Sequence, residues 1–231
     1  MMFSSANSIN LGRLLPQIVY YISAYCDMIG NGRINADDLI NVVVPTGNFG
    51  NILAAYYARK MGLPIAKLIC ASNRNRVLTD FLNTGEYNRN RSFYTTTSPS
   101  MDILISSNLE RLLYDISENN DVEIIYLMKQ LRKKGRYTVS DKIAKDIKSI
   151  FWAGWCDDEQ TAQTIKNVYE NHDYLCDTHT AVAVNVYEQY RKSTGDKTPT
   201  VIVSTANPYK FSASVLDALG GNCSDGNEFE R

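Results

Sequence analysis

The stretch that decides the fold is N-V-V-V-P-T-G-N-F-G-N-I-L-A-A-Y-Y-A-R, residues 41–59. Its three consecutive valines, residues 42–44, have the β-branched composition of a strand that is buried on both faces, and Pro45 is expected to end that strand. The glycines within residues 46–51, here called the glycine turn, allow the chain to bend tightly. From Ile52 onward apolar residues return at helical spacing, so the pattern predicts a strand, a turn and a helix in succession.

A turn between a strand and a helix N-terminus is a suitable place for an anion, because unpaired N–H groups and the positive end of the helix dipole both point at it. The glycine turn matches neither G-x-x-x-x-G-K-[ST] nor G-x-G-x-x-G, so nucleotide binding is not favoured. Asn48 and Asn51, on either side of Phe49, add side-chain amides to the turn. From these residues alone, a phosphate site and a purely structural turn are both open readings.

The composition is that of an ordinary globular protein of 231 residues, with 44% hydrophobic and 21% charged residues. A net charge of −1 offers no electrostatic argument for binding nucleic acid or an anionic membrane. No apolar run approaches about 18 residues, and residues 1–5 lack the features of a signal peptide. The five cysteines are scattered without C-x-x-C spacing, which predicts reduced thiols and a cytoplasmic protein. With His172 and His179 as the only histidines, a histidine-rich metal site is excluded and no metal is expected.

Further along the chain, residues 65–71 and 198–204 are predicted as two more buried strands. Helices are expected from about residue 10 to before residue 30, over 73–85, 101–113, 121–135, 141–151 and 158–171, from about 177 onward, and over 210–219, with a loop at 152–158. Strands that alternate with helices favour an α/β fold, an open and mostly parallel sheet with helices on both faces. We expect one domain over residues 1–219, with a helical insertion at about 101–171, and a flexible tail over 220–231.

Three polar residues outside the glycine turn are candidates for a role in binding or catalysis. Thr205 follows a predicted strand, at the end where open α/β sheets bind ligands. Arg13 lies one turn into the first helix, where a cation opposes the dipole and often has an anionic partner, although a solvated arginine is the simpler reading. His179, in the first turn of its helix, could be a base, but a capping or packing role is the expectation.

Five stretches together resemble threonine synthase, a pyridoxal-phosphate enzyme of the tryptophan-synthase-β fold type. They are S-S-A-N-S-I-N-L-G-R-L-L-P-Q-I-V-Y-Y (4–21), V-V-P-T-G-N-F-G-N-I-L-A-A-Y-Y-A-R-K-M-G-L-P (43–64), S-P-S-M-D-I-L-I-S-S-N-L-E-R-L-L (98–113), D-T-H-T-A-V-A-V (177–184) and S-T-A-N-P-Y-K-F (204–211). They occur in family order and cover nearly the whole chain, which makes the resemblance specific. A lone G-N-F-G-N would be a weak match.

The resemblance assigns roles to particular residues. It implies that the phosphate of pyridoxal phosphate is held by Gly47, Asn48, Phe49, Gly50 and Asn51. It further implies that Thr205 hydrogen-bonds the pyridine nitrogen and that Asn7, Asn10 and Arg13 lie near the phosphate of the substrate O-phosphohomoserine, with Ser8 supporting that turn. Asn207 stands where many relatives have histidine, so its role is left open.

The reaction implied is a β,γ-replacement that converts O-phospho-L-homoserine and water to L-threonine and phosphate, a carbon–oxygen lyase reaction. The family's Schiff-base lysine stands in an upstream F-K-D context that this chain lacks, and Lys60, Lys67 and Lys210 lie in stretches with other expected roles. We therefore assign no catalytic residue and expect the C-terminal portion of an enzyme, inactive alone. Two alternatives stay open: another enzyme of the fold type, such as a threonine dehydratase or cysteine synthase, and a non-catalytic protein that kept the fold for binding. N-S-I-N-x-x-R at residues 7–13 argues against the first, since those enzymes bind no phosphorylated substrate there.

Overall fold

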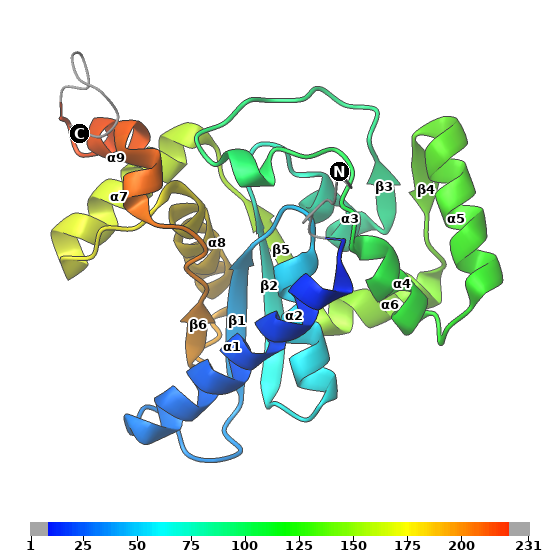
Figure 1. Cartoon of the computed structure of the whole chain (residues 1–231), viewed down its shortest axis with the longest axis horizontal. Coiled ribbons are helices and arrows are strands. Elements are labelled where there is room, and N and C mark those ends of the chain that lie inside the picture. The colour runs from blue at the N-terminus through cyan, green and yellow to red at the C-terminus, as the bar shows by residue number, and fades with distance from the viewer. Residues whose placement is uncertain (1–8, 222–231) are drawn as a thin grey trace, which may run out of the picture.

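Strand β1 (Ile40–Pro45) lies inside a four-stranded parallel sheet, and all six of its residues are buried. The computed structural model describes residues 9–221, and its main sheet has the order β5-β2-β1-β6 (Figure 1). The neighbouring strands are β2 (Ile65–Ser72), β5 (Phe151–Trp155) and β6 (Thr200–Ile202), and every pair is parallel. The predicted buried strand over residues 42–44 and the predicted parallel sheet are therefore confirmed.

The two faces of the sheet are covered by different helices because successive strand side chains point in opposite directions. Val42 and Val44 join a large core with side chains of α1 (Leu11–Gly30), α2 (Gly50–Lys60), α3 (Val77–Thr84) and α6 (Asp141–Ile150). Val43 points the other way and packs with Val182 and Val186 of α8 (Thr178–Thr194). Helix α7 (Asp158–His172) packs on α8 in turn. The expected fold class, an open α/β sheet with helices on both faces, is thus confirmed.

A second, smaller unit lies beside the main sheet, on the right of Figure 1. It holds α4 (Leu109–Ile116), α5 (Asp121–Lys134) and two short antiparallel strands, β3 (Glu86–Asn88) and β4 (Arg136–Thr138). The rings of Tyr87 and Tyr137, directly opposite each other in this ladder, stack with centroids 5.3 Å apart. The aromatic pair ties the unit to the α3 side of the core through Phe81.

The prediction of a loop over residues 152–158 is wrong, because residues 151–155 form the edge strand β5. This strand, F-W-A-G-W, is only five residues long, and its alanine and glycine weaken the strand preference of its three aromatic residues. Its pairing with β2, from Leu68 opposite Phe151 to Ser72 opposite Trp155, fixes it instead. The segment expected to be a helical insertion therefore also supplies one strand of the main sheet.

Two predicted helices start later than expected. The stretch 101–113 holds the end of a 3-10 turn, η1 (Pro99–Met101), and then the start of α4 at Leu109. The stretch 210–219 is divided between the 3-10 turn η2 (Pro208–Phe211) and α9 (Ser212–Ala218). Within residues 9–221, no helix has the length and apolarity to span a membrane. Residues 222–231 of the expected tail lie outside the described part of the chain.

Candidate functional site

A pocket of about 240 Å³ opens at the carboxyl ends of β1 and β6. The glycine turn and Thr205, which lie far apart in the sequence, both line it, where a ligand site in an open parallel sheet is expected. The remaining lining residues are Gln17 of α1, Pro45, Ser100, Met101, His179, Ala206 and Lys210. The structure therefore brings together every residue that the resemblance assigns to the cofactor.

Two backbone carbonyl groups of the glycine turn accept hydrogen bonds from other parts of the protein. The carbonyl oxygen of Gly47 accepts a hydrogen bond from Ser106 Oγ at 3.0 Å. The carbonyl oxygen of Asn48 accepts two, from Asn108 N at 3.2 Å and from Asn108 Nδ2 at 2.9 Å. No group within residues 9–221 accepts a hydrogen bond from the backbone N–H of residues 47–51. These donors, at the N-terminus of α2, are thus available to an anion in the pocket.

Phe49 gives the glycine turn its shape. It adopts a left-handed backbone conformation with φ of 63°, which is uncommon for a residue with a β-carbon. Its side chain is 1% exposed, and its ring lies 5.9 Å from the ring of Phe151. Burial of the ring therefore offsets the cost of this backbone conformation.

Gly47 is required by the approach of another part of the backbone. A β-carbon at this position would lie 2.5 Å from the carbonyl oxygen of Ser100 and 3.2 Å from the α-carbon of Met101. The sequence suggested that glycines here allow tight bending or the approach of a ligand. At Gly47 the approaching group is the protein's own η1 turn.

A buried polar network anchors the segment that carries η1. Asn73, which follows β2, donates from Nδ2 to Asp102 Oδ1 at 2.8 Å and to the hydroxyl oxygen of Thr96 at 2.8 Å. Asn75 donates to the same Asp102 oxygen at 2.8 Å, and Thr96 donates to Asp102 through its N–H and its hydroxyl. With its side-chain bonds satisfied on all sides, Asp102 fixes residues 96–102 against the sheet.

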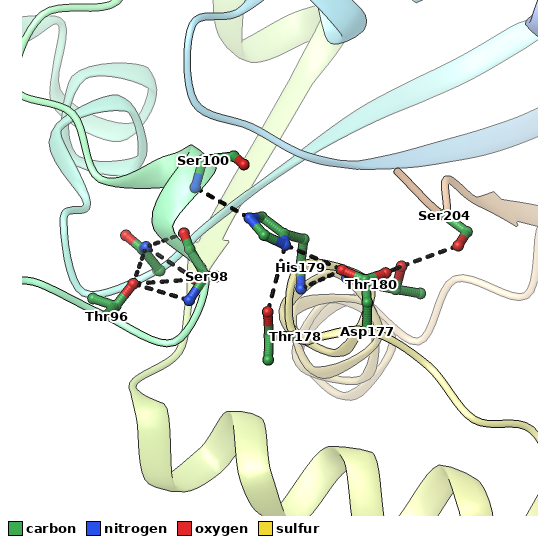
Figure 2. Close-up of polar contacts among 9 residues, drawn as sticks. Thr96, Ser98, Ser100, Asp177, Thr178, His179, Thr180 and Ser204 are labelled. Carbon is green, nitrogen blue, oxygen red and sulfur yellow. Dashed lines mark hydrogen bonds and ion pairs between the residues drawn. The ribbon is translucent and has the colours of Figure 1, made fainter. Parts of the chain in front are cut away.

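His179 connects η1 to helix α8 (Figure 2). Its Nε2 accepts a hydrogen bond from the backbone N–H of Ser100 at 3.2 Å, and its Nδ1 lies 3.1 Å from Asp177 Oδ1. Since Nε2 is an acceptor, the ring proton is on Nδ1 and is donated to the carboxylate. Burial alone would raise the pKa of Asp177, but hydrogen bonds from His179 and Thr180 outweigh it and hold this pKa below its ordinary value.

The sequence predicted a capping or packing role for His179, and in the structure its side chain packs but does not cap α8. The N-cap of α8 is Asp177, whose Oδ1 accepts from the backbone N–H of His179 at 2.8 Å. His179 as a residue is 2% exposed, and its ring lies 4.9 Å from the ring of Phe211 and forms part of the pocket wall. Thr180 links the same cluster to the end of β6, with its hydroxyl 3.2 Å from Ser204 Oγ.

Of the residues expected near the substrate phosphate, Asn10 and Arg13 lie at the start of α1. Asn7 and Ser8 are outside the described residues. Asn10 is the N-cap of α1, and its side chain accepts from the Gly12 N–H at 2.8 Å. Arg13 is exposed and one helical turn before Gln17, which lines the pocket, so both lie on one side of α1.

Other positions have structural roles. Thr205 is exposed at the pocket, and Asn207 caps η2 by accepting from Tyr209 N at 3.0 Å. Within residues 9–221, no group of three or more potential metal ligands occurs, and the four cysteines are free thiols.

From the sequence, no individual role was assigned to Ser100, Ser106 or Asn108. All three lie in the quoted stretch 98–113, so the resemblance was the signal that could have pointed to them.

Comparisons with known proteins agree with this geometry. A family model described as "Threonine synthase, C-terminal" matches residues 180–230. Human "Threonine synthase-like 1" is 45% identical over 218 residues, which cover 94% of this chain and 29% of that protein. Threonine synthase of Pseudomonas aeruginosa is 39% identical over 214 residues, covering 93% of this chain and 44% of that protein.

Among solved structures, the pyridoxal-phosphate-bound threonine synthase from Brucella melitensis superposes with a TM-score of 0.86 at 41% identity. The match covers 94% of this chain and 45% of that one. The chain thus spans less than half the length of each of these three proteins. In sequence and in fold, the chain is similar to a part of known threonine synthases, and the model of their C-terminal region matches residues 180–230.

Proposed function

We propose that the chain provides the part of a pyridoxal-phosphate-dependent threonine synthase that holds the cofactor phosphate. The complete enzyme converts O-phospho-L-homoserine and water to L-threonine and phosphate. The observation that carries the proposal is the single pocket that joins the glycine turn to Thr205. Because the chain contains no lysine in the family's Schiff-base context, it is inactive alone.

The residues present fit the phosphate of the cofactor. Five consecutive N–H groups, from Gly47 to Asn51, have no acceptor within residues 9–221, and the dipole of α2 adds positive potential at the same place. Lys210 also lines the pocket and brings a positive charge. A dianionic phosphate satisfies donors of this kind without any further acceptor from the protein.

Thr205 is the residue proposed to meet the pyridine nitrogen. It lies on the same pocket as the glycine turn and is exposed, so its hydroxyl is accessible to a ligand. A neutral hydroxyl, unlike a carboxylate, leaves the ring nitrogen largely unprotonated. When bound, pyridoxal phosphate supplies an electron sink for negative charge that develops on a substrate carbon.

Arg13 is the residue of this chain proposed to bind the substrate phosphate. Asn10 already uses its side-chain oxygen to cap α1, and Asn7 lies outside the described residues. The planar guanidinium of an arginine can donate two hydrogen bonds to a phosphate, which a lysine ammonium cannot match in geometry. We assign small molecules as its ligands, and we propose a cytoplasmic location because the four described cysteines are free thiols.

The proposal is tested by amide NMR of the chain during titration with pyridoxal phosphate, with inorganic phosphate as the competitor. We expect shifts of the amide signals of residues 47–51 and of Thr205, and reversal of the shifts at residues 47–51 by excess phosphate. An absence of shifts at these positions would contradict the cofactor assignment. A shift at residues 47–51 with either compound but none at Thr205 would support an anion site only.

The activity is tested by mixing the chain with the N-terminal part of a threonine synthase relative. Phosphate release from O-phosphohomoserine is expected from the mixture and not from either part alone. Release of ammonia from threonine instead would favour a dehydratase. Cofactor binding with no turnover in the mixture would favour a protein that kept the fold for binding.

A further inference from the structure

We propose that His179 is a positioning residue, which sets the glycine turn by holding the backbone of Ser100 against Gly47. This inference rests on the proposed function only in taking the glycine turn to be the cofactor-phosphate site. His179 does not contact the free N–H groups of that turn in any hydrogen bond of the structure. It acts through η1, because it accepts a hydrogen bond from the backbone N–H of Ser100 (Figure 2).

Three residues, His179, Ser100 and Gly47, are in contact one after the other. The imidazole Nε2 of His179 accepts from Ser100 N at 3.2 Å. The carbonyl oxygen of Ser100 then lies so close to Gly47 that a β-carbon there would be 2.5 Å away. Movement of Ser100 toward Gly47 is blocked by contact, and its N–H is held by His179, so a shift of Ser100 changes its hydrogen bond to His179 as well. The position of Gly47 is therefore coupled to the acceptor on His179.

Asp177 determines which nitrogen of His179 can act as that acceptor. Its Oδ1 lies 3.1 Å from His179 Nδ1 and also caps the first turn of α8. A carboxylate in this place keeps the ring hydrogen on Nδ1, which leaves the lone pair of Nε2 directed at Ser100. Asp177 and its histidine are both almost fully buried, at 1% and 2% exposed, so water does not compete for these bonds.

The surroundings of the imidazole restrict it to this single orientation. The ring of Phe211 packs on it at 4.9 Å, and Thr178 Oγ1 lies 3.4 Å from Nδ1. Asp177 contacts the ring, and Lys210 lines the same pocket from η2. The ring is thus packed on one side, hydrogen-bonded at both nitrogens, and adjacent to the pocket.

A pair of substitutions separates positioning from packing. His179→Leu keeps apolar bulk and removes the acceptor, whereas His179→Gln places an amide oxygen where it can accept from Ser100 N–H. In the Leu variant we expect amide hydrogen exchange at Ser100 to rise about tenfold or more, with a shifted Gly47 amide signal. Its affinity for pyridoxal phosphate is expected to fall about tenfold, and the Gln variant to recover most of both losses. His172→Leu, an exposed histidine at the end of α7, is the matched control and should change neither.

Two results with the variants would overturn the proposal. One is unchanged Ser100 exchange and an unmoved Gly47 signal in the Leu variant, and the other is an equal loss in the Gln and Leu variants. A measurement on the unmodified chain covers the case in which the Leu variant does not fold. With two histidines in the sequence, nitrogen-15 spectra can assign the tautomer, and His179 should carry its proton on Nδ1 with Nε2 unprotonated at pH 7.5. A proton on Nε2 would overturn the proposal.

Failure of this inference is distinguishable from failure of the proposed function. Hydrogen exchange at Ser100 and the His179 tautomer need no cofactor. Absence of pyridoxal-phosphate binding in the unmodified chain would contradict the cofactor assignment. The exchange and tautomer data would still decide whether His179 holds Ser100 on the turn.

Discussion

The carbonyl oxygen of Ser100 lies against the α-carbon of Gly47, with no space between them for a side chain. Since both atoms belong to the backbone, neither can move away as a flexible side chain would. The η1 turn therefore packs directly on the glycine turn, whose N–H groups have no acceptor within residues 9–221, and both turns line the pocket. Strain at the turn and affinity for an anion should accordingly change together.

Gly47→Ala tests this relationship. The new methyl group would lie 2.5 Å from the Ser100 oxygen, so we expect a loss of about 1–3 kcal/mol in the free energy of unfolding, with weaker pyridoxal-phosphate binding. Urea unfolding and ligand titration measure the two effects. Gly30→Ala is the matched control, because nothing lies within 4 Å of a β-carbon at Gly30 and the residue is helical. Equal stability of the two variants would refute the packing argument.

Thr205→Ala should separate ligand binding from stability. The side chain is exposed, so the free energy of unfolding should change by no more than about 0.5 kcal/mol. Loss of one hydrogen bond to the ring nitrogen should weaken pyridoxal phosphate about threefold to tenfold, and Thr205→Ser should restore it. Inorganic phosphate, which has no ring, should bind both variants equally. Exposed Thr95 provides the control substitution, Thr95→Ala, with no expected effect.

Arg13→Ala is informative in a protein that also carries the N-terminal part. There we expect the KM for O-phosphohomoserine to rise about tenfold to a hundredfold, because a charge-assisted contact to the substrate phosphate is lost. The affinity for pyridoxal phosphate should stay the same. Arg33→Ala removes an exposed cation beyond the other end of α1 and serves as the control. An equal loss for substrate and cofactor would place Arg13 elsewhere than at the substrate phosphate.

Alkaline pH should destabilise the fold. Burial raises the pKa of the Cys156 thiol from 9.0 to about 12, and burial likewise raises the pKa of Tyr87 from 10.0 to about 12. Both folded-state values exceed the unfolded ones, so their stabilising contribution is complete below pH 9 and is lost as the pH rises toward 12. Each group should add a slope of up to about 1.4 kcal/mol per pH unit. Urea unfolding at pH 8 to 11 measures it. Cys156→Ala should flatten the slope, and Cys26→Ala, at an exposed thiol, should not.

The parts of the fold that were predicted correctly are those that follow from the residue types within one short stretch of sequence. Val42, Val43 and Val44 indicate a buried strand by composition, and the strand, turn and helix that follow are where residues 41–59 predict them. Strand β5 was missed because its order comes from pairing with β2, which the letters F-W-A-G-W do not specify. The helix predicted from residue 101 was displaced by η1 and by the loop that Asp102 anchors.

For the candidate site, the resemblance brought the glycine turn and Thr205 together before any geometry was known, and the pocket contains both. Their roles toward a cofactor remain predictions. The contacts of Ser100 with Gly47 and with His179 could not be predicted, because they join segments distant in sequence through backbone atoms, which leave no pattern of residue types. Arg13 lies one helical turn before Gln17, which lines the pocket. That Arg13 binds the substrate phosphate stays a prediction.

The short strand β6 has a consequence for handling the protein. It pairs with β1 along one side, and no strand within residues 9–221 pairs with its other side. None of its three residues is fully buried, in contrast to the fully buried β1. An open strand edge is a template for chain-to-chain association. Preparations of this polypeptide by itself should therefore self-associate as concentration rises, and addition of a polypeptide that covers this edge should return them to a single species.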